Sequence, residues 1–147
     1  EEKTCTLRGC VDQFSATLSR ADGSFPSGAH RIDVTADGVT LSCTFSFAGG
    51  GVVATCPPGL DVTVGPAETC TETRTGNATG YRCDPIPGQF VERLTLLGTP
   101  SQMRVVQSVD GVALLDQAMA PSYEAAYPNG PECGSPCQQA SATLTLP

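Results

Sequence analysis

Tryptophan is absent from this chain of 147 residues, aromatic residues make up only 5% of it, and histidine occurs once. Any core must therefore be built mainly from Val, Leu, Ile and Ala, with a few Phe. A catalytic triad would depend on His30 alone, and no Gly-x-Ser-x-Gly nucleophile elbow accompanies it. We expect His30 to be a partly buried histidine at the rim of a sheet, and the protein not to be an enzyme.

Positive charge is also scarce: Lys and Arg number 8 against 15 Asp and Glu, which gives a net charge of −7. A nucleic acid or an anionic membrane surface would repel such a chain, and no stretch concentrates basic residues. No apolar run is long enough to span a membrane. We therefore expect neither a nucleic-acid partner nor a transmembrane span. Because the chain begins at Glu1 rather than Met, we expect a processed or trimmed product.

Motifs for cofactors and metal ions are missing as well. The glycines at 49–51 lack the Lys and the helix of a phosphate-binding loop. Three aspartates stand in Asp-Gly pairs, at 22–23, 37–38 and 110–111, without the alternating carboxylates of a calcium loop. Turn formation explains these pairs better, and nothing indicates a glycosidase-type carboxylate pair. We expect no cofactor, no metal and no catalytic residue.

What the chain does contain is strong two-residue alternation. From Val39 to Phe47 every odd position is apolar or Cys and every even position is Thr or Ser. This pattern is typical of a strand with one buried face. The Asp37-Gly38 pair before it suits a two-residue hairpin, since a type I′ turn needs positive φ at both central residues. Folding the chain there places Ile32 opposite Cys43, and apolar residues meet along the hairpin.

Weaker alternation recurs at residues 14–18, 60–64 and 140–146. Residues 90–97 indicate a strand of unclear facing, and 103–109 and 112–119 flank the Asp-Gly pair at 110–111 as a second hairpin. About eight short strands between turns predict an all-β fold, an antiparallel immunoglobulin-like β-sandwich. At this length we expect one disulfide-stapled domain over residues 1–147. The Thr-rich stretch 68–82 is predicted to be a loop, and at most a helical turn is expected near 137–140.

Eight cysteines in so short a chain indicate an oxidising compartment, so we predict a secreted, periplasmic or outer-surface protein. A second fold of the chain at 49–51 extends the hairpin to a three-stranded meander over 29–56. It places Cys43 opposite Cys56, our first predicted disulfide, although Cys43 could instead cross to the other sheet. The second predicted disulfide, Cys70–Cys83, closes the Thr-rich loop.

Elimination leaves Cys5 and Cys10 to pair with Cys133 and Cys137, in a combination that stays open. Either combination would clamp the two ends of the chain together. The alternatives are a redox site or a zinc site. However, the spacing of Cys133 and Cys137 is CxxxC rather than CxxC, and the short knuckles of zinc ribbons are absent. The residues therefore favour structural disulfides.

A candidate binding loop lies near the C-terminus, where Tyr123, Tyr127 and Asn129 flank a Pro-rich irregular stretch. Tyr81 could add to a binding face. The alternative is that these tyrosines pack over the edge of the core. The sequon that begins at Asn77 predicts an exposed position if the host glycosylates it.

Two runs resemble known proteins. The run from Phe25 to Gly38, a Pro/Gly turn followed by an alternating strand and Asp-Gly, resembles bacterial immunoglobulin-like modules. The run from Tyr123 to Leu146 is similar to the tail of cysteine-rich lipoproteins of myxobacteria. Together the two runs cover about a quarter of the chain. The resemblance implies a bacterial surface protein with an immunoglobulin-like fold. It transfers no functional residues, because that lipoprotein family has no known activity.

These observations predict a non-enzymatic, extracytoplasmic binding module with a protein or surface-glycan partner. Two alternatives stay open. A self-assembling subunit of a surface layer or filament would join copies through exposed edge strands or through residues 1–4. A protease inhibitor would present the segment 84–88, held by the neighbouring Cys83.

Overall fold

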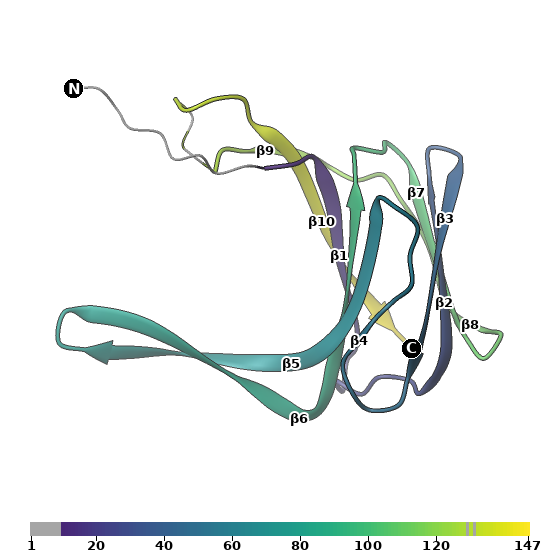
Figure 1. The fold of residues 1–147 in the computed structure, drawn as a ribbon, viewed down its shortest axis with the longest axis horizontal. Helices are drawn as coiled ribbons and strands as arrows, with labels where there is room; N and C mark the ends of the chain where they lie inside the picture. Colours follow the sequence, from purple (N-terminus) through teal and green to yellow (C-terminus); the bar gives the residue numbers. More distant parts are fainter. Residues whose placement is uncertain (1–9, 129, 131) are drawn as a thin grey trace.

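The computed structural model describes residues 10–128, 130 and 132–147, and within these ranges the chain forms ten strands and no helix. The strands are β1 (Gln13–Arg20), β2 (Gly28–Ala36), β3 (Val39–Phe47), β4 (Val52–Val53), β5 (Leu60–Thr75), β6 (Ala78–Leu97), β7 (Met103–Val109), β8 (Val112–Met119), β9 (Glu124–Ala126) and β10 (Cys137–Leu146). They build a six-stranded sheet, β4-β5-β6-β1-β10-β9, and a four-stranded sheet, β3-β2-β7-β8 (Figure 1). The predicted all-β sandwich is confirmed. In the described part of the chain, no helix is long and apolar enough to cross a membrane.

The core fills the space between the two sheets. Because side chains alternate between the faces of a strand, every second apolar residue points inward. Phe14, Ile32, Leu60, Leu94 and Val105, from five different strands, are each exposed by no more than 2%. Apolar burial of this kind is the main stabilising contribution to the sandwich.

The predicted hairpin between β2 and β3 has the expected register, with Ile32 opposite Cys43. Its turn has positive φ at both central residues, 46° at Asp37 and 86° at Gly38, as a type I′ turn requires. The third strand of the predicted meander is present only in part. A single bridge, Thr44 to Thr55, keeps the expected register to β3. β4 pairs instead with β5, so the chain passes at this point into the other sheet.

The C-terminal strand differs from the prediction in two ways. β10 pairs in parallel with β1, whereas the other strand pairs of the two sheets are antiparallel. Residues 137–140, for which a helical turn was allowed, begin β10 as extended chain, so that prediction is wrong. The reason is non-local: these residues lie between β9 and β1, and pairing with both neighbours requires the extended conformation.

The stretch predicted as a Thr-rich loop is a β-hairpin, which corrects that prediction. Beyond an irregularity between Pro66 and Glu68, the β5–β6 ladder resumes at Glu68–Pro85 and continues to Thr75–Ala78. Every residue of 68–85 is exposed, and Figure 1 shows this part of β5 and β6 projecting from the sandwich. We call residues 68–85 the arm. A hairpin with no buried face lacks the apolar alternation by which strands are predicted.

The root of the arm is fixed to the sandwich by Phe90. Its ring packs edge-on against Phe47 with ring centroids 5.0 Å apart. Its N–H donates to the carbonyl oxygen of Gly23 at 2.9 Å. Gly23 has a φ of 80°, and a Cβ at this position would lie 2.6 Å from the side chain of Gln89. The Gln89 side chain is flexible and could move away, so it is the positive φ of Gly23 that favours glycine in this loop.

Candidate functional site

Cysteine pairing sets the covalent frame of every candidate site. The structure contains the disulfides Cys10–Cys137, Cys43–Cys56 and Cys70–Cys83. The two predicted pairs, Cys43–Cys56 and Cys70–Cys83, are confirmed. Of the two pairings that the sequence left open for Cys10, the structure has the one with Cys137. Cys133 is disulfide-bonded as well, and Cys5 lies outside the described residues. Three disulfides in one small β protein indicate an oxidising, extracytoplasmic compartment.

The arm brings one carboxylate close to two sulfur atoms. Glu68, Cys70 and Cys83 each have a potential ligand atom within 4.8 Å of the others. The two sulfurs, however, are bonded to each other, and a disulfide sulfur does not act as a thiolate ligand. The three residues therefore form the disulfide-linked base of the arm. Their chemistry does not favour a zinc or redox centre.

The predicted binding loop is divided between two places. Tyr123 is half-buried, packs against the core, and donates its hydroxyl hydrogen to the carbonyl oxygen of Pro100 at 2.7 Å. Tyr123 therefore packs over the edge of the core, which was the alternative to a binding role for these tyrosines. Tyr127 is 44% exposed and lines a separate cleft. Asn129 lies outside the described residues.

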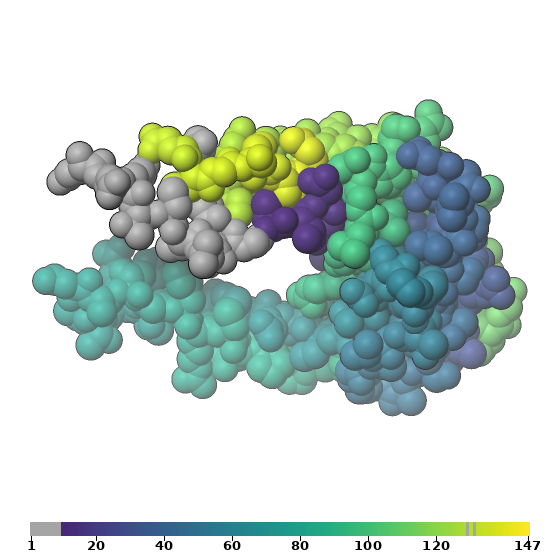
Figure 2. Space-filling model, turned by 45° about the horizontal axis from the view of Figure 1, so that its top comes forward, coloured from purple at the N-terminus to yellow at the C-terminus, as the bar shows by residue number. Residues whose placement is uncertain are grey.

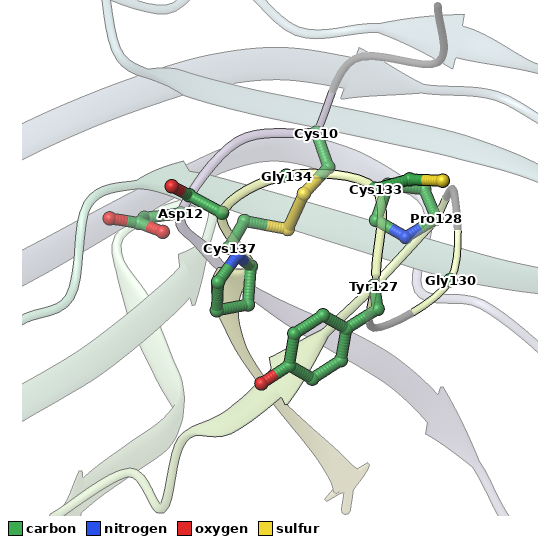
Figure 3. Close-up of a pocket in the computed structure, with 10 residues that line it drawn as sticks. Cys10, Asp12, Tyr127, Pro128, Gly130, Cys133, Gly134 and Cys137 are labelled. Atoms are coloured by element: carbon green, nitrogen blue, oxygen red, sulfur yellow. A yellow bond between two sulfur atoms is a disulfide. The ribbon is translucent and has the colours of Figure 1, made fainter. Parts of the chain in front are cut away.

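The cleft beside Tyr127 has a volume of about 310 Å³ and lies where residues 10–12 meet the segment 127–137. Figure 3 shows the Cys10–Cys137 disulfide at its centre, with Tyr127 to one side and Cys133 nearby. Asp12 lines the cleft too, and its carboxylate accepts a hydrogen bond from the Gln138 N–H at 2.7 Å. The cleft is thus covalently braced and could hold a small polar group.

The arm is the larger exposed surface, and Figure 2 shows it as a separate projection from the body of the protein. Its two faces differ in chemistry, because residues that face each other across the ladder share a face. One face carries the threonines of β5, at 69, 71, 73 and 75. The other carries the Cys70–Cys83 disulfide and, next to it, the facing pair Glu72 and Tyr81. Tyr81 is 76% exposed, the most exposed aromatic ring among the described residues.

A third group of polar side chains is buried between the sheets. His30 is 2% exposed, while Glu92 and Gln107 are fully buried. His30 lies opposite Phe45 in the β2–β3 ladder and is buried more deeply than the rim position expected for it. One ring nitrogen contacts the Pro26 carbonyl oxygen at 2.6 Å and the other contacts Gln107 at 3.0 Å. Both nitrogens are therefore occupied, and burial lowers the pKa of the imidazole.

Sequence reasoning did not identify Glu92 or Gln107. The signal was available, because Glu92 has the same parity along its strand as Leu94, and Gln107 the same as Val105. A polar residue at an inward-facing position of an alternating strand is expected to be buried and hydrogen-bonded. Reading the alternation for its polar exceptions would have found both residues.

The chain matches no protein-family model, no curated protein and no solved structure. The function is therefore inferred from the arm, the cleft and the buried group alone.

Proposed function

We propose that the protein is a non-enzymatic, extracytoplasmic binding module, built on an immunoglobulin-like sandwich, whose arm makes contact with a protein or surface-glycan partner. The observation that carries this proposal is the arm itself. Residues 68–85 form a regular hairpin with no buried side chain, and the hairpin adds nothing to the core. An isolated two-stranded hairpin is marginally stable in water. The Cys70–Cys83 disulfide stabilises the arm by restricting its disordered states.

Tyr81 is the residue of the arm best suited to bind. Tyrosine supplies a large rigid contact area with a polar end and is enriched at the energetic centres of interfaces. Tyr81 lies on the same face as the disulfide and opposite Glu72, so its backbone is held in one position. Catalysis is not favoured, since the one histidine is buried with both ring nitrogens occupied.

Self-assembly is the second candidate, and the edges of the strands favour it. Within the residues that the structure describes, β8 is the last strand of its sheet and has an unpaired outer edge, and the arm leaves two edges unpaired. Unpaired edges are sites where another chain can add a strand. The protease-inhibitor alternative gains less support, because residues 84–88 belong to β6 and do not form a separate loop.

The test compares the wild-type protein with Tyr81→Ala and with a variant in which a short turn replaces residues 68–85. Each is immobilised and exposed to an extracytoplasmic extract and to a glycan array, and its mass in solution is measured by light scattering. Thr73→Ala, on the opposite face of the arm, is the matched control. We expect the wild type and the control to retain bound material that Tyr81→Ala and the armless variant lose. Equal binding by the armless variant would contradict the proposal. An oligomer that dissociates when the arm is removed would favour self-assembly.

A further inference from the structure

The buried polar group lies directly beside the root of the arm. Glu92 follows Phe90 closely along β6, and Phe90 is the residue that anchors the arm. Glu92 points inward from the six-stranded sheet, while His30 on β2 and Gln107 on β7 point inward from the four-stranded sheet. The Gln107 amide nitrogen lies 2.9 Å from Glu92 Oε1 and 3.0 Å from His30 Nδ1. The group is therefore a polar connection between the two sheets.

Counting hydrogens fixes the protonation of His30. The amide nitrogen of Gln107 carries two hydrogens, and its two partners are Glu92 Oε1 and His30 Nδ1. Nδ1 must then accept, so the proton of the neutral ring is on Nε2. From there it is donated to the carbonyl oxygen of Pro26 at 2.6 Å. The low pKa that burial gives this ring agrees with a neutral imidazole.

Among the described residues, two buried side-chain oxygens have no hydrogen-bond partner, Glu92 Oε2 and Gln107 Oε1. If Glu92 were ionised, both atoms could only accept, and neither could satisfy the other. One proton on Glu92 Oε2 changes this, because a carboxylic acid and an amide can exchange two hydrogen bonds. We propose that Glu92 is held as a neutral carboxylic acid that donates its proton to Gln107, so that the connection between the sheets at the arm root is a proton-binding site.

The surroundings of Glu92 agree with a neutral acid. The residues opposite it on the neighbouring strands are Leu18 on β1 and Val64 on β5, both apolar. Among the described residues, His30 reaches Glu92 through Gln107, and the charge of Asp110 acts on His30 rather than on Glu92. Burial raises the pKa of Glu92 to about 7, against the opposing effect of the Gln107 hydrogen bond.

The direction of the pH effect follows from this raised pKa. Below its ordinary value of 4.5, Glu92 is protonated in both the folded and the unfolded chain. As the pH rises toward 7, the unfolded chain releases this proton while the folded protein retains it, so stability falls. His30 acts in the opposite sense: its lowered pKa costs stability as the pH falls below 6.5. Raising the pH from 4.5 to about 7 should therefore reduce the contribution of Glu92 to the stability of the contact between the sheets beside the arm.

The first experiment follows the carboxyl carbons of the wild-type protein by ¹³C NMR as the pH is varied. We expect the Glu92 signal to keep the chemical shift of an acid at pH 6, where ordinary carboxylates have ionised, and to titrate near 7. A Glu92 signal that titrates near 4.5 would overturn the proposal. This measurement needs no variant, so it decides the question even if substitutions in the core prevent folding.

The second experiment measures the unfolding equilibrium of the wild type and of Glu92→Gln at pH 5 and pH 8. Glutamine keeps the size and hydrogen-bonding groups of the neutral acid but cannot ionise. From the shift of 4.5 to about 7, the unfolding constant of the wild type should rise about 70-fold more than that of the variant. The effect of His30 is common to both proteins and cancels in this ratio.

Glu68→Gln, on the exposed arm, removes the same charge and is the matched control. It should have the same pH dependence as the wild type. Equal pH dependence in the wild type and Glu92→Gln would overturn the proposal. This readout does not involve a partner of the arm, so the two proposals can fail separately.

Discussion

Strands β5 and β6 run through both the sandwich and the arm, and the two regions are stabilised by different interactions. On β6, Leu94 lies in the sandwich and is fully buried, whereas Tyr81 lies in the arm and is 76% exposed. Both stretches pair with β5 through the same kind of antiparallel ladder. Only the sandwich buries one face of that ladder. Backbone pairing therefore gives both regions their shape, but apolar burial stabilises only one of them.

The disulfides make the comparison sharper, because two of them close loops of equal length. Cys43–Cys56 and Cys70–Cys83 each join residues separated by 13 positions. The first begins at a fully buried cysteine in the core, and the second lies between two exposed cysteines in the arm. Cys43–Cys56 therefore constrains a segment that the core already orders. Cys70–Cys83 constrains the arm, which has no core contacts to order it.

The largest expected difference comes from truncating one side chain in each region of β6. Leu94→Ala removes buried methyl groups and leaves a cavity between the sheets, at a cost of about 2–5 kcal/mol in the free energy of unfolding. Tyr81→Ala removes a larger side chain but should change that free energy by no more than about 0.5 kcal/mol, because no core contact is lost. Denaturant unfolding monitored by circular dichroism measures both. If Tyr81→Ala lowered the free energy of unfolding as much as Leu94→Ala does, the arm would have to contribute to the stability of the core.

The second comparison removes each disulfide by a pair of Cys→Ala changes. Loss of Cys43–Cys56 should lower the free energy of unfolding by about 3 kcal/mol, as expected for a loop of this length. Loss of Cys70–Cys83 should leave the unfolding of the sandwich nearly unchanged, because the arm can open while the core stays folded. Its effect should appear as faster amide exchange confined to residues 68–85. Uniformly faster exchange through the sandwich would contradict this separation of the two regions.

The strands of the sandwich could be predicted from the sequence where burial of one face gives an alternation of apolar and polar residues. The β2–β3 register followed from alternation together with the Asp37-Gly38 turn, and both signals are local. The sequence of the arm predicts a loop because its threonines alternate with charged residues and cysteine rather than with apolar residues. Without an apolar face, a strand leaves no such signal. The parallel pairing of β1 with β10 has no local signal, since it joins opposite ends of the chain. The site was predicted least well: Tyr81 was named as one candidate, while Glu92 and Gln107 were missed.

The smallest expected effect concerns aspartate hydrogen bonds at the two regions. Asp37 lies in the β2–β3 turn, and its carboxylate accepts hydrogen bonds from the backbone N–H groups of Ser101 and Gln102 and from the Ser101 hydroxyl. These bonds, first among them the one from Gln102, lower the pKa of Asp37 below its usual 3.8. A lowered pKa means that the stabilisation is present above pH 3.8 and is lost as the pH falls through the folded value.

Asp37→Asn should therefore lower the melting temperature slightly at pH 7, and the difference from the wild type should shrink as the pH approaches 3. Asparagine tolerates the left-handed conformation found at this turn, so backbone strain does not contribute to the change. Asp84→Asn in the arm is the matched control, because in the described part of the chain the Asp84 carboxylate has one hydrogen-bond partner, the exposed Arg82 side chain on the same strand. It should leave the melting temperature unchanged at both pH values. Calorimetry at pH 7 and pH 3 separates the two variants, and equal shifts for both would mean that the Asp37 hydrogen bonds between the turn and Ser101–Gln102 do not stabilise the sandwich.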